Sequence, residues 1–168
     1  MSEDLVLSVV EELAGIQSSQ FINHIYDPVF WLDFIPFRKK TAGIISDMRR
    51  FTYDFEESFV LDPLGTLKYD LHSKGEVEVL EDKETEKGRF WKIKITSIEP
   101  KTTALVNVRL RDTKNSIKVG FYLYELHLDL GLMSTLGFGR EAILFATRAT
   151  LRKCISIFHK TIGKKMWN

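Results

Sequence analysis

The stretch EAILFATRATLRKCISIFHKTIGKKMWN, residues 141–168, is the longest helix-like segment of the chain, and the rest of the sequence is best interpreted around it. Leu144, Leu151, Ile155, Phe158 and Ile162 follow one another at steps of seven, four, three and four residues. At 3.6 residues per turn these side chains share one apolar stripe, which predicts a helix of about five turns. Such a stripe must be buried, and a sheet built from the middle of the chain is the surface available for it.

Residues 37–130 alternate between apolar and polar side chains, which is the period of half-buried strands. Trp91, Ile93 and Ile95, for example, alternate with Lys92 and Lys94. Short polar stretches such as EDKETEKG (residues 81–88) and DTKNS (residues 112–116) separate these runs and predict turns. We therefore predict about six to eight strands, whose successive members pair as antiparallel neighbours.

The first part of the chain predicts one strand followed by two short helices. Leu5–Leu13 (LVLSVVEEL) is apolar and β-branched, which is typical of a strand. Gln17–Tyr26 has apolar residues at helical steps, and Val29–Phe34 follows a proline that suits the first position of a helix. The predicted fold class is therefore α+β, with an antiparallel sheet, two short helices and one long C-terminal helix in a single domain spanning residues 1–168.

The composition is that of a soluble globular protein, with 44% hydrophobic and 28% charged residues. A net charge of +1 argues against a nucleic-acid partner. The single cysteine, Cys154, excludes an internal disulfide and fits a reducing compartment. The acidic N-terminus is not followed by an apolar signal segment, and no apolar run approaches the length of a membrane span. We therefore expect a cytoplasmic location and no stable membrane insertion, and we leave a homodimer open.

The order of these elements resembles the helix-grip (SRPBCC) superfamily, which includes START lipid-transfer domains, birch-pollen-allergen-like plant proteins and polyketide cyclases. Leu5–Leu13 looks like its first strand, and Gln17–Phe34, followed by Ile35 and Pro36, looks like its helix pair. Ile98–Val108 and Glu125–Leu130 look like its closing strands. The chain would form an uncharacterised branch of this superfamily, with an archaeal origin left open. A resemblance of element order supports the fold more than any function.

The resemblance implies a curved sheet that grips the long helix and holds a hydrophobic ligand, lipid-like or aromatic, between them. Tyrosines strengthen this interpretation, because a buried phenol needs a polar partner such as water or the polar end of a ligand. The alternative is that the same rings simply fill the core. The predicted cavity lining comprises Phe51, Tyr53, Phe55, Tyr69, Trp91, Ile93, Tyr122, Tyr124, Leu144, Leu151 and Phe158.

The sequence offers little for catalysis. The four histidines are scattered, and none stands at metal-ligand spacing with a second His, Cys or carboxylate. His127 has acidic neighbours, but its side of the strand is expected to face solvent. Cys154 lies among apolar residues of the predicted helix without an evident base, which favours an inert thiol. The sequence GFGR at residues 137–140 is more typical of a hinge than of a phosphate site.

We therefore predict no catalytic residue, no metal and no cofactor, and three functions stay open. The first is binding or transport of a small hydrophobic ligand. The second is an enzyme of the cyclase, dehydratase or hydrolase kind. The third is a protein-interaction module without a cavity.

Overall fold

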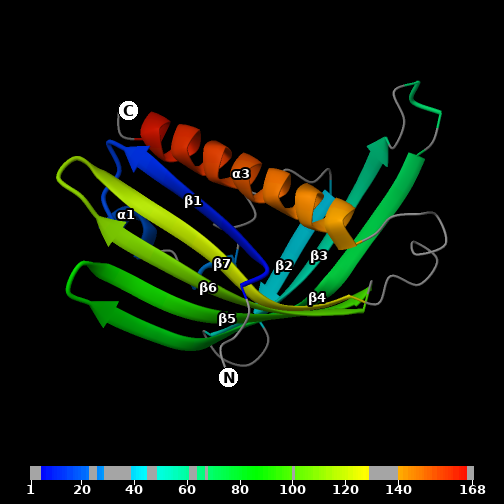
Figure 1. Ribbon diagram of the computed structural model, residues 1–168, viewed down its shortest axis with the longest axis horizontal. Coiled ribbons are helices and arrows are strands. Elements are labelled where there is room, and N and C mark those ends of the chain that lie inside the picture. The colour runs from blue at the N-terminus through cyan, green and yellow to red at the C-terminus, as the bar shows by residue number, and fades with distance from the viewer. Residues whose placement is uncertain are drawn as a thin grey trace.

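A computed structural model describes residues 5–22, 26–28, 39–44, 49–60, 64–66, 68–99, 101–128 and 140–165. Seven strands form one antiparallel sheet in the order β1-β7-β6-β5-β4-β3-β2, so the first strand of the chain pairs with the last. Helix α3 lies along one face of this sheet (Figure 1). The elements are β1 (Leu7–Ala14), α1 (Ser19–Ile22), β2 (Lys39–Ile44), β3 (Arg50–Val60), β4 (Lys68–Thr85), β5 (Gly88–Glu99), β6 (Thr102–Asp112), β7 (Ser116–Leu128) and α3 (Arg140–Lys165).

The predicted α+β helix-grip fold class is wrong. Most of the described chain is a seven-stranded antiparallel sheet, and its helices are α3 and the four-residue α1. Of the first predicted short helix, Gln17–Tyr26, only Ser19–Ile22 is helical in the described part. The second predicted helix, Val29–Phe34, lies outside the described residues.

Tertiary contacts hold both ends of the segment Gln17–Tyr26. The Ser18 hydroxyl donates a hydrogen bond of 2.8 Å to the Asp112 carboxylate, and the Tyr26 hydroxyl donates one to Asp82. Both ends of the segment are thus tied to distant strands. Short segments follow such contacts more than their own helix propensity, because a single helical turn is unstable by itself.

The core lies between the sheet and α3. Its most deeply buried side chains are Val9, Trp91, Ile117 and Val119, which belong to one apolar cluster with residues of α3. Burying one such side chain stabilises the fold by about 1.5–3 kcal/mol. We call the face of the sheet that carries α3 the inner face, and the opposite one the outer face.

Helix α3 uses the stripe that its sequence predicted. Ile155 and Phe158 are buried in the main cluster, while Leu144 and Leu151 pack against a second cluster formed by Leu7, Ala104 and Leu123. Polar contacts to β1 support the helix, since His159 Nε2 donates a 3.0 Å hydrogen bond to the Ala14 carbonyl oxygen and Arg152 lies 3.7 Å from Glu11. No helix among the described residues combines the length and the apolar character needed to cross a membrane.

Three irregularities interrupt the pairing of the strands. Two lie in the β4–β5 ladder, at Lys74/Gly75 and at Val79/Glu81, and one lies in the β6–β7 ladder at Leu105/Val106. A bulge inserts an extra residue, bends the strand and increases its twist. Figure 1 shows β2, β3 and β4 turned steeply relative to β1, β7 and β6.

Candidate functional site

Three hydroxyl groups gather on the inner face where β3, β4 and β5 run side by side. Tyr53 of β3 is directly opposite Gly75 of β4, and Gly75 is directly opposite Ser97 of β5. Directly opposed residues point to the same face of a sheet. The Ser97 hydroxyl lies 3.5 Å from that of Ser73 and also donates to the Lys74 carbonyl oxygen at 3.3 Å. We call Tyr53, Ser73 and Ser97 the hydroxyl cluster.

Gly75 makes room for this cluster. A Cβ atom at this position would lie 2.7 Å from the Tyr53 hydroxyl oxygen and 2.2 Å from the Thr96 carbonyl oxygen. These separations are far below normal van der Waals contact, so a larger residue would displace the phenol or the backbone. The phenol therefore lies directly over the β4 backbone at the bulge.

The surroundings of the hydroxyl cluster are apolar but incompletely covered. The Tyr53 ring stacks on Phe55 with 4.8 Å between ring centroids and 17° between ring planes. Phe51, Val77 and Ile95 form the next row of the same face, and all three are only partly buried. This part of the inner face is therefore an apolar surface with a polar centre.

The structure separates the predicted lining residues into groups. Phe51, Tyr53 and Phe55 lie at the hydroxyl cluster, whereas Trp91 and Phe158 are packed in the main core. Ile93, Leu144 and Leu151 are partly buried at the edges of the two clusters. Tyr69 pairs with Phe59 at the far end of β3 and β4, but its side chain is not among those described.

The two tyrosines of β7 do not lie where alternation predicted. Phe121 and Leu123 pack on the inner face, so Tyr122 points to the outer face. Tyr124 is the extra residue of the β6–β7 bulge, because Leu105 pairs with Glu125 and Val106 with Leu123. The bulge reverses the alternation along β7, and Tyr122 and Leu126 therefore do not share a face.

A network of charged and polar side chains lies beside the core at the other end of β4. The Asp82 carboxylate accepts hydrogen bonds from Arg89 Nε at 2.7 Å and from the Tyr26 hydroxyl. The Asp82 side chain is only 5% exposed and that of Arg89 28%. Trp91 is directly opposite Asp82 in the β4–β5 ladder.

In this network the pKa of Tyr26 is higher than usual and the pKa of Asp82 is lower. Burial and the hydrogen bond to Asp82 raise the pKa of Tyr26 to about 12. Burial alone would raise the pKa of the Asp82 carboxyl, but the hydrogen bonds from Arg89 and Tyr26 outweigh it and hold that pKa below its ordinary value. At neutral pH the phenol stays protonated and the carboxylate stays charged, so this network is a structural ion pair and not a proton-transfer pair.

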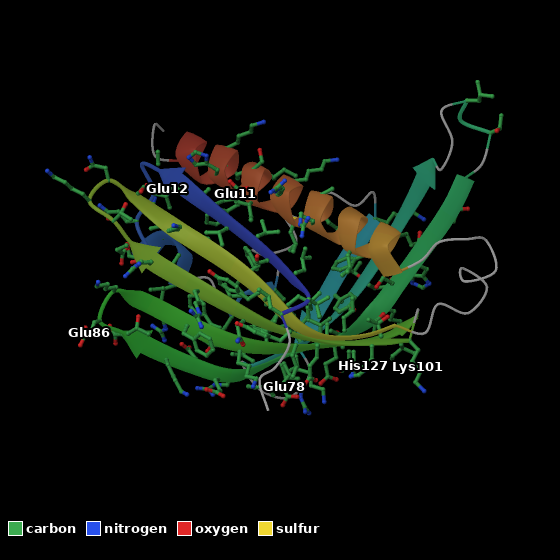
Figure 2. The ribbon with its side chains drawn as sticks, viewed as in Figure 1. Glu11, Glu12, Glu78, Glu86, Lys101 and His127 are labelled. Atoms are coloured by element: carbon green, nitrogen blue, oxygen red, sulfur yellow. The ribbon has the colours of Figure 1, made fainter. Side chains whose placement is uncertain are left out.

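The other candidate groups remain isolated. Burial raises the pKa of the Cys154 thiol, which lowers its thiolate fraction and its reactivity. His127 and Glu78 lie on the side of the sheet away from α3 (Figure 2). Within the described residues, no group of three or more His, Cys, Asp or Glu side chains could hold a metal ion.

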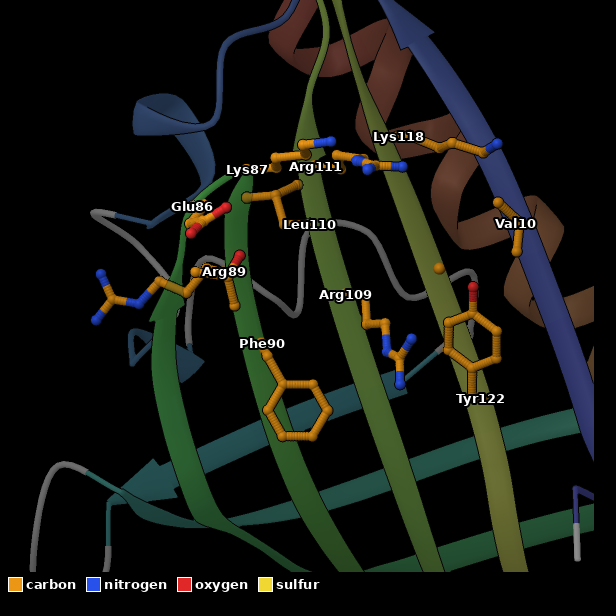
Figure 3. Close-up of a pocket in the computed structure, with 12 residues that line it drawn as sticks. Val10, Glu86, Lys87, Arg89, Phe90, Arg109, Leu110, Arg111, Lys118 and Tyr122 are labelled. Carbon is orange, nitrogen blue, oxygen red and sulfur yellow. The ribbon is translucent and has the colours of Figure 1, made fainter.

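A pocket on the outer face was not predicted from the sequence. It has a volume of about 770 Å³ and crosses β5, β6, β7 and β1 near the β4–β5 turn. Figure 3 shows Arg109 between Phe90 and Tyr122, with α3 behind the strands. Lys87, Arg111 and Lys118 form a row above these three residues in Figure 3. Gly120, directly opposite Arg109 in the β6–β7 ladder, also lines the pocket.

The fold is similar to those of several proteins of known structure. A conserved protein from Geobacillus kaustophilus superposes with a TM-score of 0.64 over 94% of both chains at 10% identity. An uncharacterised protein from Rhizobium leguminosarum gives a TM-score of 0.52 at 13% identity, covering 92% of this chain and 95% of that one. A protein from Mycobacterium smegmatis gives a TM-score of 0.51 at 12% identity, covering 92% of this chain and 86% of that one. Such low identities establish a shared fold alone.

No protein-family model matches the chain, and no curated protein matches it significantly.

Proposed function

We propose that the protein binds a small, mainly apolar molecule on the inner face of the sheet, between the β3–β5 region and α3. The supporting observation is the hydroxyl cluster of Tyr53, Ser73 and Ser97 within an apolar face that is only partly buried. A polar group in an apolar core is unfavourable unless it finds a partner. A ligand with one polar end would add a partner for the Tyr53 hydroxyl and would cover the apolar rows around it.

Binding energy would come mainly from apolar contact. Phe51, Val77 and Ile95 expose apolar surface toward the proposed site, and covering it releases about 25 cal/mol per Å² before the entropy of association is subtracted. The hydroxyl cluster would orient the ligand through one or two hydrogen bonds. In contrast, Trp91, Ile117 and Val119 are already buried by the protein itself and have no surface left to offer.

An enzyme on the same scaffold is the less supported function. The pKa of Tyr26 is raised further above pH 7 and that of Asp82 is lowered further below it, so neither group exchanges a proton readily at pH 7. A cytoplasmic location and a homodimer remain predictions from the sequence. The superfamily resemblance likewise remains a prediction, since the similar structures carry no stated activity.

The direct experiment is native mass spectrometry of the protein purified from the cells that produce it, followed by extraction of any retained molecule. We expect an added mass of a few hundred daltons, which is the size range of ligands that such sites enclose. Titration with Nile red, a neutral apolar fluorophore, should show saturable binding with a blue-shifted emission. No retained mass together with no Nile red binding would contradict the proposal.

Tyr53→Phe tests the polar part of the site. The substitution removes one hydroxyl and keeps the ring stacked on Phe55. We expect 1-decanol to displace Nile red about fivefold less well, because one hydrogen bond contributes about 1 kcal/mol. Tyr122→Phe removes a phenol from the outer face and is the matched control, for which we expect no change. Equal displacement from wild-type protein and Tyr53→Phe would show that the hydroxyl cluster does not contact the ligand.

A further inference from the structure

The outer-face pocket is lined by more cations than carboxylates. Four of its lining residues, Lys87, Arg109, Arg111 and Lys118, make no ion pair among the described residues. Glu86 is the one carboxylate that lines the pocket. Arg89 also lines it, but its guanidinium is bonded to Asp82 and points away from the pocket in Figure 3. The net charge of the whole chain is +1, so this concentration is local.

Two of these cations are held directly opposite each other. Arg111 of β6 pairs in register with Lys118 of β7, and like charges directly opposed across a ladder destabilise a sheet. On its other side Lys118 is opposite Glu12, whose carboxylate accepts a 2.5 Å hydrogen bond from the Ser116 hydroxyl. An anion lying over Arg111 and Lys118 would relieve their repulsion.

Arg109 is oriented by aromatic rings. Its guanidinium carbon lies 5.9 Å from the ring centroid of Phe90 and 5.3 Å from that of Tyr122. These cation–π contacts hold the planar group in place and leave its N–H groups without an acceptor among the described residues. A guanidinium so placed can donate two parallel hydrogen bonds to a phosphate or carboxylate.

A glycine gives the pocket its depth. Gly120 is opposite Val10 on one side and Arg109 on the other, and a Cβ atom there would lie 2.6 Å from the Tyr122 ring. Without a side chain at this point, the Tyr122 ring folds over the backbone and a hollow remains. The resulting volume of about 770 Å³ falls within the range of small-molecule sites, about 300–1,000 Å³.

We propose that this pocket binds a small organic phosphate that carries an aromatic ring, the chemistry of a nucleoside phosphate. Arg109, Arg111 and Lys118 would hold the phosphate, and the rings of Phe90 and Tyr122 would contact the planar part. A nucleic-acid strand fits less well, because beyond the pocket the outer face carries acidic residues beside the basic ones. Glu76 and Glu78, for example, neutralise Arg50 at 3.0 and 3.3 Å.

Isothermal titration calorimetry with ADP, adenosine and inorganic phosphate at 150 mM NaCl tests this proposal. ADP should bind with a Kd of about 10–100 μM, and adenosine and inorganic phosphate should each bind at least about tenfold more weakly, because each lacks half of the recognised chemistry. Arg109→Gln should weaken ADP binding about tenfold or more. Arg50→Gln, at an arginine already paired on the same face, should leave it unchanged.

Three results would contradict the proposal. Absence of ADP binding at 1 mM (about −4 kcal/mol) would overturn it, and so would equal affinities for ADP and adenosine. Tighter binding of a twelve-residue oligo-dT than of ADP would assign the pocket to single-stranded nucleic acid instead. Thermal melting of Arg109→Gln must match wild type, and Lys118→Gln provides a second variant if it does not. The inner-face site is independent, so Tyr53→Phe should bind ADP normally.

Discussion

Trp91→Ala should lower the free energy of unfolding by about 4 kcal/mol, which is a large part of the stability of an ordinary domain. Trp91 is 0% exposed and lies in the same cluster as Ile155 and Phe158 of α3. Removal of the indole loses its transfer free energy and leaves a cavity that the surrounding strands cannot fill completely. We expect the midpoint of urea denaturation, followed by far-ultraviolet circular dichroism, to fall accordingly.

Ile98→Ala is the matched control for this prediction. Ile98 lies on the same strand, β5, but is 72% exposed at the position where the β4–β5 ladder slips. We expect a change within about 0.5 kcal/mol, as for surface substitutions in general. A loss of less than about 1.5 kcal/mol in Trp91→Ala would mean that α3 is not packed on the inner face as described.

Local pattern was sufficient to predict the long helix and most of the strands, although the predicted turn at residues 81–88 was too long, because β4 continues to Thr85. Alternation located Trp91, Ile93 and Ile95 on one face of β5, and the apolar stripe located Ile155 and Phe158 of α3 in the core. These signals are local because side-chain period is set by the backbone geometry of each element. The overall class was wrong because most of the described chain is a seven-stranded antiparallel sheet, and of Gln17–Tyr26 the described helical part is the single turn Ser19–Ile22.

A single bulge shows where local pattern fails. In the sequence the alternation along β7 runs unbroken from Tyr122 to Leu126, yet the β6–β7 ladder inserts Tyr124 and reverses the faces. A one-residue slip moves every later side chain to the opposite face. Nothing in the local sequence distinguishes this strand from a regular one, because the bulge depends on the partner strand.

The candidate sites depend on contacts that a single sequence does not reveal. One of the three residues of the hydroxyl cluster was predicted, since Tyr53 was among the expected lining residues, but Ser73 and Ser97 were not. The outer pocket was missed entirely. Phe90, Arg109 and Tyr122 come from three strands, and only the register of those strands brings them together.

Asp82→Ala should lower the free energy of unfolding by about 3 kcal/mol at pH 7. The substitution leaves the partly buried Arg89 guanidinium and the Tyr26 hydroxyl without their shared acceptor. Loss of one partner of a largely buried pair lowers the free energy of unfolding more than loss of both partners does, because the remaining charge stays desolvated. Arg89 keeps 28% exposure, so water compensates part of the loss.

The difference in free energy of unfolding between wild type and Asp82→Ala should decrease at both low and high pH. The folded pKa of Asp82 is below its ordinary value of 3.8, so its contribution is complete above the unfolded pKa and disappears as pH falls through the folded pKa. The folded pKa of Tyr26 is raised from 10.0 to about 12, so its contribution is complete below pH 10 and disappears as pH rises through about 12. The difference should therefore be constant between about pH 5 and 9 and smaller outside that range.

Urea denaturation of both proteins at pH 2.5, 7 and 11 measures this difference directly. Glu11→Gln is the matched control, because it removes an exposed carboxylate 3.7 Å from Arg152 and should change stability by less than about 1 kcal/mol. An equal loss for Asp82→Ala at pH 2.5 and pH 7 would show that the charge of Asp82 does not stabilise the fold. A loss that shrinks at low pH while Glu11→Gln stays near wild type would show that the ionised carboxylate stabilises the fold, as its hydrogen bonds from Arg89 and Tyr26 lead us to expect.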